Sequence, residues 1–516
     1  MSLLRNFATV GGATAVSRVL GFGRDIMMAA ALGTGPVADA FFVAFRFPNL
    51  FRRLFAEGAF NAAFVPLFTR ALEEGGETAA RRFGSESLSA LLTVLLIFIA
   101  LAEIAMPILM YALAPGFSDD PEKFDLAILL TRIAFPYLAL ASLLALFSGI
   151  LNARGKFAAA AFAPALLNVV FIIALAIILL TDHAETRDAG ILLSWVVLIG
   201  GVAQLFTVIW AARDAGIDLR ILRPRLTPGV RRLGRLVLPG ALAGGVTQIN
   251  IVVGTIIASL SAGAVSYLYY ADRVYQLPLG IVGIAIGVVL LPDIARQLQS
   301  GNETSANDTQ NRALEFSIAL TLPAAIALAV VAEPIIQVLF ERGAFTAADT
   351  RETSAALIAF ATGLPAFVLV KVFQPAFFAR EDTKTPMWFA GISVVVNIAG
   401  SLALFSSLEH VGIAIATSAA GWVNAGLLAW RLRRDGTFVI DAAARRRLPL
   451  ILLAALLMGV ALYFGADLVD PWLEHDSGWI RAGGLAVIVV SGIVLFAAFV
   501  QLTGAVDFRR ALRRRR

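Results

Sequence analysis

Long apolar stretches constrain this chain more than any other feature. Runs of about 20 hydrophobic residues, the length that crosses a bilayer as a helix, recur along its whole length. Only 15% of the 516 residues are charged, whereas a typical soluble domain carries about 25%. We therefore expect an all-α polytopic membrane protein with little soluble mass.

The hydropathy pattern predicts fourteen spans, of which the second and the eighth are too long to be straight and perpendicular to the bilayer. Pro48 and Pro278 are the expected kink sites in these two spans. The spans are expected at residues 10–33, 37–69, 84–113, 124–151, 157–181, 188–212, 234–258, 262–298, 312–339, 350–379, 385–406, 410–433, 447–468 and 478–503.

The loops between the spans alternate in charge. One set is rich in arginine, as is the tail "RRALRRRR", and the other set, which includes "SDDPEK", is neutral or acidic. The loop with Glu303 and Asp308 fits this alternation least well. Because arginine-rich loops stay in the cytoplasm, both termini are expected there, which requires an even number of spans. Topology and contact with anionic lipid account for the basic tail.

The chain repeats itself at an offset of about 227 residues. A repeat of six helices keeps both copies in the same orientation, and parallel repeats place a substrate site between two lobes near the membrane midplane. We expect the lobes at 1–220 and 221–436, with two unmatched helices and a basic tail at 437–516. The aligned pairs include Arg46 with Arg273, Gly116 with Gly343, Pro136 with Pro365 and Asn168 with Asn397.

Charged residues deep within spans are costly, so they face a cavity or one another. In the second span, Asp39, Arg46 and Arg53 are seven residues apart and share one helix face, and Asn49 and Glu57 lie close to it. This face cannot contact lipid. We expect it to line a water-filled, net cationic cavity.

The first span carries a second polar face. Arg18 and Asp25 share it, and Arg24 projects about 100° away from Asp25. Arg52 of the second span lies off the Arg53 face in an ideal helix, but a change of register at Pro48 would bring it to the same cavity.

Internal ion pairs are the alternative explanation for these charges. Arg24 with Asp25, or Arg53 with Glu57, could hold helices together. The first two spans hold five arginines against three acids, however, and this excess favours an anion-binding cavity. Arginine matches phosphate and carboxylate in a bidentate manner, so the expected ligand is a polyanion.

Several other function classes fit poorly. The chain has no cysteine, and His183, His410 and His475 fall in expected loops or helix ends without ligand-like spacing, so we expect no metal site and no catalytic residues. A membrane-embedded transferase or hydrolase needs a base and a nucleophile within reach of each other. Gly21 and Gly23 follow no strand, so they indicate close helix packing rather than a phosphate loop.

Three motifs carry a resemblance to a known family. The segments "SRVLGFGRD" (17–25), "ADAFFVAFRFPNLFRRLFAEGAFNAAFVP" (38–66) and "YYADRVYQLPLG" (269–280) closely resemble the bacterial MurJ (MviN) family of lipid II flippases. The resemblance covers the whole chain, including the extra pair of helices at the end. This family belongs to a superfamily that also contains multidrug extruders and polysaccharide-lipid flippases.

The resemblance implies two six-helix lobes around a central cavity and a groove formed with the last two helices. It implies alternating access that moves lipid II, the undecaprenyl-diphosphate-linked peptidoglycan precursor, from the cytoplasmic to the periplasmic leaflet of the bacterial inner membrane. Export of another lipid-linked oligosaccharide, or of drugs, is the alternative within the superfamily. An extruder of cations should have an acidic cavity, and this one is expected to be basic. A purely structural membrane protein would not need the buried charges.

The resemblance also implies roles for single residues. Asp39 stands at a position essential in the family, and Glu57 is expected to help close the cytoplasmic side. Asp272 lies beside the eighth-span arginine and is expected at the cavity wall. The positions expected to hold the diphosphate and sugar headgroup are Arg18, Arg24, Asp25, Arg52 and Arg273.

Two departures from the family pattern limit what can be carried over. Gln276 stands where many relatives have glutamate, which leaves a protonation or gating role there open. Asn397 is present, but the acidic partners of a sodium site found in some relatives are missing, so no such site is expected. We expect no cofactor, a monomer, contact with membrane lipids and with the peptidoglycan-synthesis machinery, and no nucleic-acid partner. The sequence leaves open whether membrane potential or a coupling ion drives the cycle.

Overall fold

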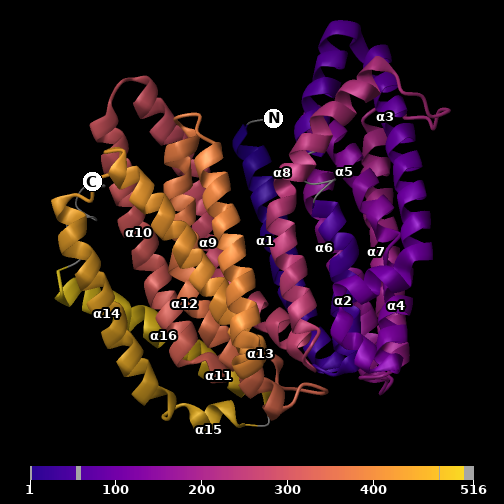
Figure 1. Cartoon of the computed structure of the whole chain (residues 1–516). Coiled ribbons are helices and arrows are strands. Elements are labelled where there is room, and N and C mark those ends of the chain that lie inside the picture. The colour runs from indigo at the N-terminus through magenta and orange to yellow at the C-terminus, as the bar shows by residue number, and fades with distance from the viewer. Residues whose placement is uncertain (1–2, 54–59, 476, 505–516) are drawn as a thin grey trace. The chain divides into compact units, whose positions relative to one another are not determined.

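The computed structural model describes residues 3–53, 60–475 and 477–504, and within these ranges the chain is helical and contains no strand. The all-α prediction is therefore confirmed. The chain forms two compact units (Figure 1). Unit 1 comprises Met1–Ser266 with the short segment Arg342–Phe345, and unit 2 comprises Tyr267–Glu341 and Thr346–Arg516.

Unit 1 holds eight α-helices and one short 3₁₀ helix among its described residues. They are α1 (Leu3–Leu32), α2 (Pro36–Phe51), α3 (Asn61–Leu113), η2 (Pro115–Asp119), α4 (Pro121–Ala134), α5 (Tyr137–Ala153), α6 (Ala158–Leu180), α7 (Arg187–Asp214) and α8 (Pro228–Ala258). Helix α3 bends at Gly76, whose φ of 66° is not helical. The packing of α8 on α3 places α8 in unit 1, so the units divide later in the chain than the expected lobes, whose boundaries stay predictions.

Unit 2 holds the later helices. They are α9 (Ala264–Gln299), whose first three residues belong to unit 1, then α10 (Glu303–Val330), α11 (Ala332–Phe340), α12 (Ala347–Phe378), α13 (Lys384–Arg434), α14 (Ala442–Ala466), α15 (Asp470–Leu473) and α16 (Gly478–Leu502). Helix α13 bends at Glu409. The capping box of Thr346 and Asp349 starts α12, because each side chain bonds the other's backbone N–H.

The helices follow the expected spans with informative differences. The described part of the second span is not α-helical throughout, because α2 ends at Phe51 and residues 52, 53 and 60 are π-helical. Pro48 lies inside α2, so the helix continues through this proline and does not break there. The ninth span is divided between α10 and α11 at Val331. Among the described residues, nine helices are long and apolar enough to cross a membrane, so the count of fourteen stays a prediction.

Aromatic rings fill much of the core of unit 1. Phe60 stacks on Phe64 with centroids 5.2 Å apart, and Phe64 stacks on Phe83 at 5.7 Å. All three are buried with residues of α5 and α7. Offset ring pairs add about 0.5–1.5 kcal/mol each to the effect of burial. This cluster fixes the start of α3 against α5 and α7.

Small residues bring the helices of unit 2 close together. Gly363 of α12 lies against Ser418 of α13, and a Cβ at this glycine would be 2.6 Å from the serine hydroxyl oxygen. That hydroxyl donates to the carbonyl of Ala359 at 2.7 Å. Small residues allow close approach of membrane helices, and hydroxyl groups then bond across the interface. The last two spans, α14 and α16, pack on each other, and α14 packs on α10.

Two glycines that the sequence repeat pairs have the same structural role. A Cβ on Gly116 would lie 2.3 Å from the backbone oxygen of Ser259, directly after α8, and a Cβ on Gly343 would lie 2.4 Å from that of Ala30, at the end of α1. The backbone N–H after Gly343, that of Ala344, donates to the same Ala30 oxygen at 2.9 Å. Each of these two connecting segments therefore packs on the C-terminal end of a long helix, which supports the repeat.

We expect Gly343→Ala to lower the free energy of unfolding by about 2–4 kcal/mol, since the methyl group meets a carbonyl oxygen and φ is +58°. Gly301→Ala is the matched control, because its φ is +74° but its Cβ would meet nothing within 4 Å. Thermal unfolding of the purified proteins in detergent should show a much larger loss for the first variant. Equal losses would contradict the steric explanation.

Candidate functional site

A buried ion pair lies near the C-terminal end of α1. Arg24 and Asp25 are 8% and 3% exposed, and the Arg24 guanidinium donates to Asp25 Oδ1 at 2.7 Å and 3.1 Å. A third guanidinium nitrogen donates to Asn168 Oδ1 of α6 at 3.0 Å. Asn168 in turn donates to the backbone oxygen of Ser17 at 3.0 Å. This network fixes the Arg24 side chain and ties α1 to α6.

Arg18 has a different environment on the same helix. It lies half-way along α1 and is exposed. In the part of the chain that the structure describes, no acidic side chain pairs with Arg18. An exposed guanidinium in the middle of a span is costly against lipid, so its position favours aqueous surroundings. Arg18 therefore stays a candidate for contact with an anionic ligand.

Asp39 of α2 is completely buried, at 0% exposure, and accepts bonds from several groups. Lys123 of α4 donates to its Oδ2 at 2.7 Å. The backbone N–H of Gly263 donates to Oδ2 at 3.0 Å, and the N–H and hydroxyl of Ser266 donate to Oδ1 at 3.1 Å and 2.7 Å. The Lys123 ammonium also lies 4.1 Å from the Phe117 ring centroid. The seven-residue spacing predicted that Asp39 faces a cavity. In the structure it is buried instead, and its hydrogen bonds join three segments of unit 1.

The other polar residues of α2 become more accessible toward its C-terminal end. Arg46 is half-buried and donates to the Thr255 hydroxyl of α8 at 3.2 Å. Asn49 donates to the backbone oxygen of Phe45 at 2.7 Å and accepts from Arg52 Nε at 3.0 Å. Arg52 thus shares contacts with the polar face despite its offset in an ideal helix.

The end of this segment is only partly described. Arg53 is exposed and π-helical, two residues after the end of α2. Glu57 lies outside the described residues, so its pairing and gating roles stay predictions.

Three further candidates lie on α9, in unit 2. Gln276 donates from its side-chain amide to the Asp272 carboxylate one turn earlier. The Arg273 guanidinium lies over the Tyr269 ring, 4.6 Å from its centroid, in a cation–π contact. Asp272 and Arg273 are half-buried and Gln276 is exposed. A carboxylate at this position could donate to Asp272 only when protonated, whereas the glutamine amide donates without a titratable proton.

Comparison with known proteins identifies the family. Residues 28–482 match the family described as "Lipid II flippase MurJ". The chain belongs to the lipid II flippase MurJ family. A "Probable lipid II flippase MurJ" of Rhizobium meliloti (strain 1021) is 53% identical over 509 residues, which cover 98% of this chain and 94% of the relative. Another of that name, from Rhizobium tropici, is 49% identical over 521 residues, with coverages of 100% and 98%.

Solved structures agree with this membership. The structure "Lipid II flippase MurJ, inward closed conformation" matches with a TM-score of 0.79 and 28% identity, over 98% of this chain and 99% of that one. An inward-facing MATE family multidrug transporter of the MOP superfamily matches with a TM-score of 0.67 over 82% and 95%. Its 16% identity shows a shared fold alone. The resemblance drawn from the three motifs is confirmed.

The structure adds residues that the sequence did not single out for the MurJ family site. Asn168 accepts a hydrogen bond from Arg24 and so holds its side chain. The repeat could have pointed to Asn168, because it pairs this residue with Asn397. The Asn397 side chain also accepts a hydrogen bond, from the Thr417 hydroxyl at 3.1 Å. Lys123 had no such signal, because it belongs to "SDDPEK", which hydropathy places in an acidic loop. Among the described residues, no group of three or more His, Asp or Glu side chains could hold a metal ion.

Proposed function

We propose that this protein moves lipid II from the cytoplasmic to the periplasmic leaflet of the bacterial inner membrane, to supply cell-wall synthesis. The observation that carries the proposal is identity of up to 53%, over nearly the full length, with proteins named as probable lipid II flippases. The protein is thus a transporter of a lipid-linked precursor rather than an enzyme.

The arginines of both units suit the chemistry of such a substrate. The headgroup of lipid II carries a diphosphate, and guanidinium groups bind phosphate through two parallel hydrogen bonds. We assign this contact to Arg18, Arg24, Arg52 and Arg273, with Asp25 holding Arg24 in its orientation. The prenyl chain stays in the bilayer while the polar headgroup crosses through an aqueous cavity that opens to each side in turn.

Topology and driving force follow from the same charges. We propose that both termini lie in the cytoplasm, because arginine-rich loops and a basic tail favour that side of the membrane. A negative-inside potential favours outward movement of an anionic headgroup, with or without a coupling ion. We propose that the protein works as a monomer without a cofactor, beside the peptidoglycan-synthesis machinery.

Direct binding separates this proposal from drug extrusion, the alternative that the fold allows. Purified protein in detergent should bind lipid II, and inorganic diphosphate should weaken that binding, whereas ethidium, a cationic drug, should not compete. Tighter binding of ethidium than of lipid II would overturn the proposal in favour of a multidrug extruder.

A further inference from the structure

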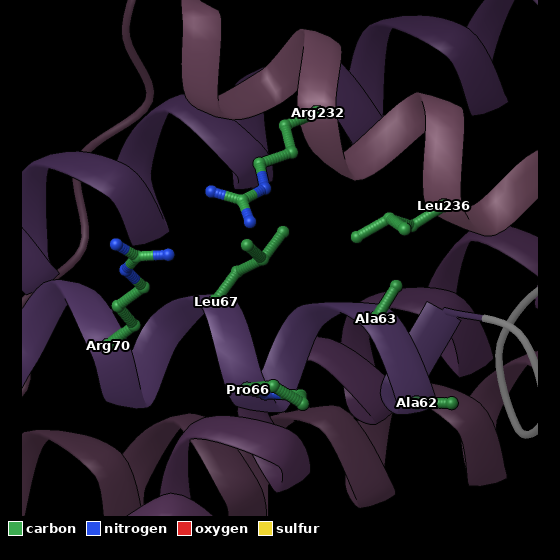
Figure 2. Close-up of a pocket in the computed structure, with 7 residues that line it drawn as sticks. All are labelled: Ala62, Ala63, Pro66, Leu67, Arg70, Arg232 and Leu236. Carbon is green, nitrogen blue, oxygen red and sulfur yellow. The ribbon is translucent and has the colours of Figure 1, made fainter.

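A pocket of about 450 Å³ opens between the first turns of α3 and those of α8, apart from the residues assigned to lipid II. Figure 2 shows Arg70 and Arg232 at one end of it and Ala62, Ala63 and Leu236 at the other. Pro66 and Leu67 lie between these ends and complete its lining. The pocket thus has a cationic end and an apolar end.

The two ends coincide with the polarity change along both helices. On α3 the apolar segment "NAAFVPLFT" comes directly before Arg70, and the charged segment "RALEEGGETAARR" begins with it. On α8 the basic segment that contains Arg232 comes first and the apolar segment follows. Such a change marks the membrane–water boundary, where arginine heads lie at the level of the lipid headgroups. The pocket therefore crosses that boundary with its arginines on the water side.

Both arginines have donors to spare. Arg70 Nε donates to Glu74 Oε1 at 2.8 Å, and this exposed pair leaves the two terminal nitrogens of Arg70 without a bond in the described part of the chain. No acidic side chain among the described residues pairs with Arg232. Both guanidinium groups are exposed, and Figure 2 shows them extending over the same open space beside Leu67.

We propose that this pocket binds an anionic phospholipid. The two guanidinium groups take the phosphate, and the first segment of one acyl chain lies on Ala63, Leu67 and Leu236, while the rest of the lipid remains in the bilayer. Charge complementarity selects the anionic headgroup, since a zwitterionic lipid has the same phosphate with a cation attached. A soluble phosphate compound shares the phosphate chemistry but gains nothing from the apolar end.

Native mass spectrometry of the full-length protein, titrated with dioleoylphosphatidylglycerol or dioleoylphosphatidylcholine, tests the proposal. We expect the first lipid to bind more tightly, and the double variant Arg70→Gln/Arg232→Gln to weaken it about tenfold. Arg231→Gln/Arg235→Gln is the matched control, because both arginines are exposed on α8, neither lines the pocket, and the same charge is removed. This control should change the affinity by less than about twofold.

Leu236→Gln distinguishes a lipid from a soluble phosphate. It should weaken binding of the phosphatidylglycerol, because the acyl chain contacts Leu236, whereas a soluble phosphate held by the two arginines alone would not depend on this side chain. Equal losses in the control and the pocket double variants would overturn the proposal, since the general surface charge would then explain binding. No preference between the two lipids, or unchanged binding of the phosphatidylglycerol to Leu236→Gln, would overturn it as well.

Discussion

Replacing Arg24 by alanine is expected to lower lipid II transport by roughly tenfold to a hundredfold, while the protein still inserts into the membrane. Charge-assisted hydrogen bonds to an anion contribute about 1.5–3 kcal/mol each, which sets this range. Complementation of a strain depleted of its own lipid II flippase, with lipid II binding by the purified variant, measures the effect. A variant that transports and binds normally would remove Arg24 from the substrate site.

A neutral pair separates the substrate role of Arg24 from a scaffold role. Arg24→Ala also leaves Asp25 buried without the two bonds it receives from the guanidinium, which should cost about 3 kcal/mol of stability. In Arg24→Gln/Asp25→Asn the buried charges are gone, so stability should return toward that of the unchanged protein. Transport should stay low. Recovery of transport in the double variant would show that the pair only holds helices together.

Asp39→Ala is expected to be the most destabilising single change, with a loss of about 3–5 kcal/mol. It removes the acceptor of all four bonds from Lys123, Gly263 and Ser266, and it leaves the Lys123 ammonium, 8% exposed, without that carboxylate. Thermal unfolding in detergent measures the loss.

Two further variants make the Asp39 result specific. Asp188→Ala removes an exposed acid from the first turn of α7 and should change stability by less than about 0.5 kcal/mol. Adding Lys123→Met to Asp39→Ala should recover part of the loss, because no buried cation then remains. If the Asp39→Ala variant were as stable as the unchanged protein, this result would contradict the structural role of the carboxylate.

The sequence predicted the helices and the family well because both depend on local patterns. Apolar runs of span length identify α6, α7 and α16 to within a few residues, whereas α3 and α13 extend far beyond single expected spans. The repeat correctly gave Gly116 and Gly343 one role. The change from α-helix to π-helix after Phe51 was less visible, since "RFPNLFRRLF" keeps an α-helical periodicity.

The environment of each charge could not be predicted in the same way. Helical spacing shows which residues share a face, but it does not show what that face meets. Asp39 and Arg53 share a face by spacing, yet one is completely buried and the other exposed. The partner that decides this for Asp39 is Lys123, 84 residues away in the chain and on another helix. Tertiary contacts of this kind have no periodicity that a single sequence reveals.

The most direct test of the account is the leaflet location of lipid II in cells depleted of this protein. Lipid II accessible from the periplasmic side should fall while total lipid II accumulates, and expression of the intact chain should restore it. The Arg24→Gln/Asp25→Asn variant, though stable, should not restore it. Normal periplasmic exposure of lipid II in the depleted cells would contradict the proposed function.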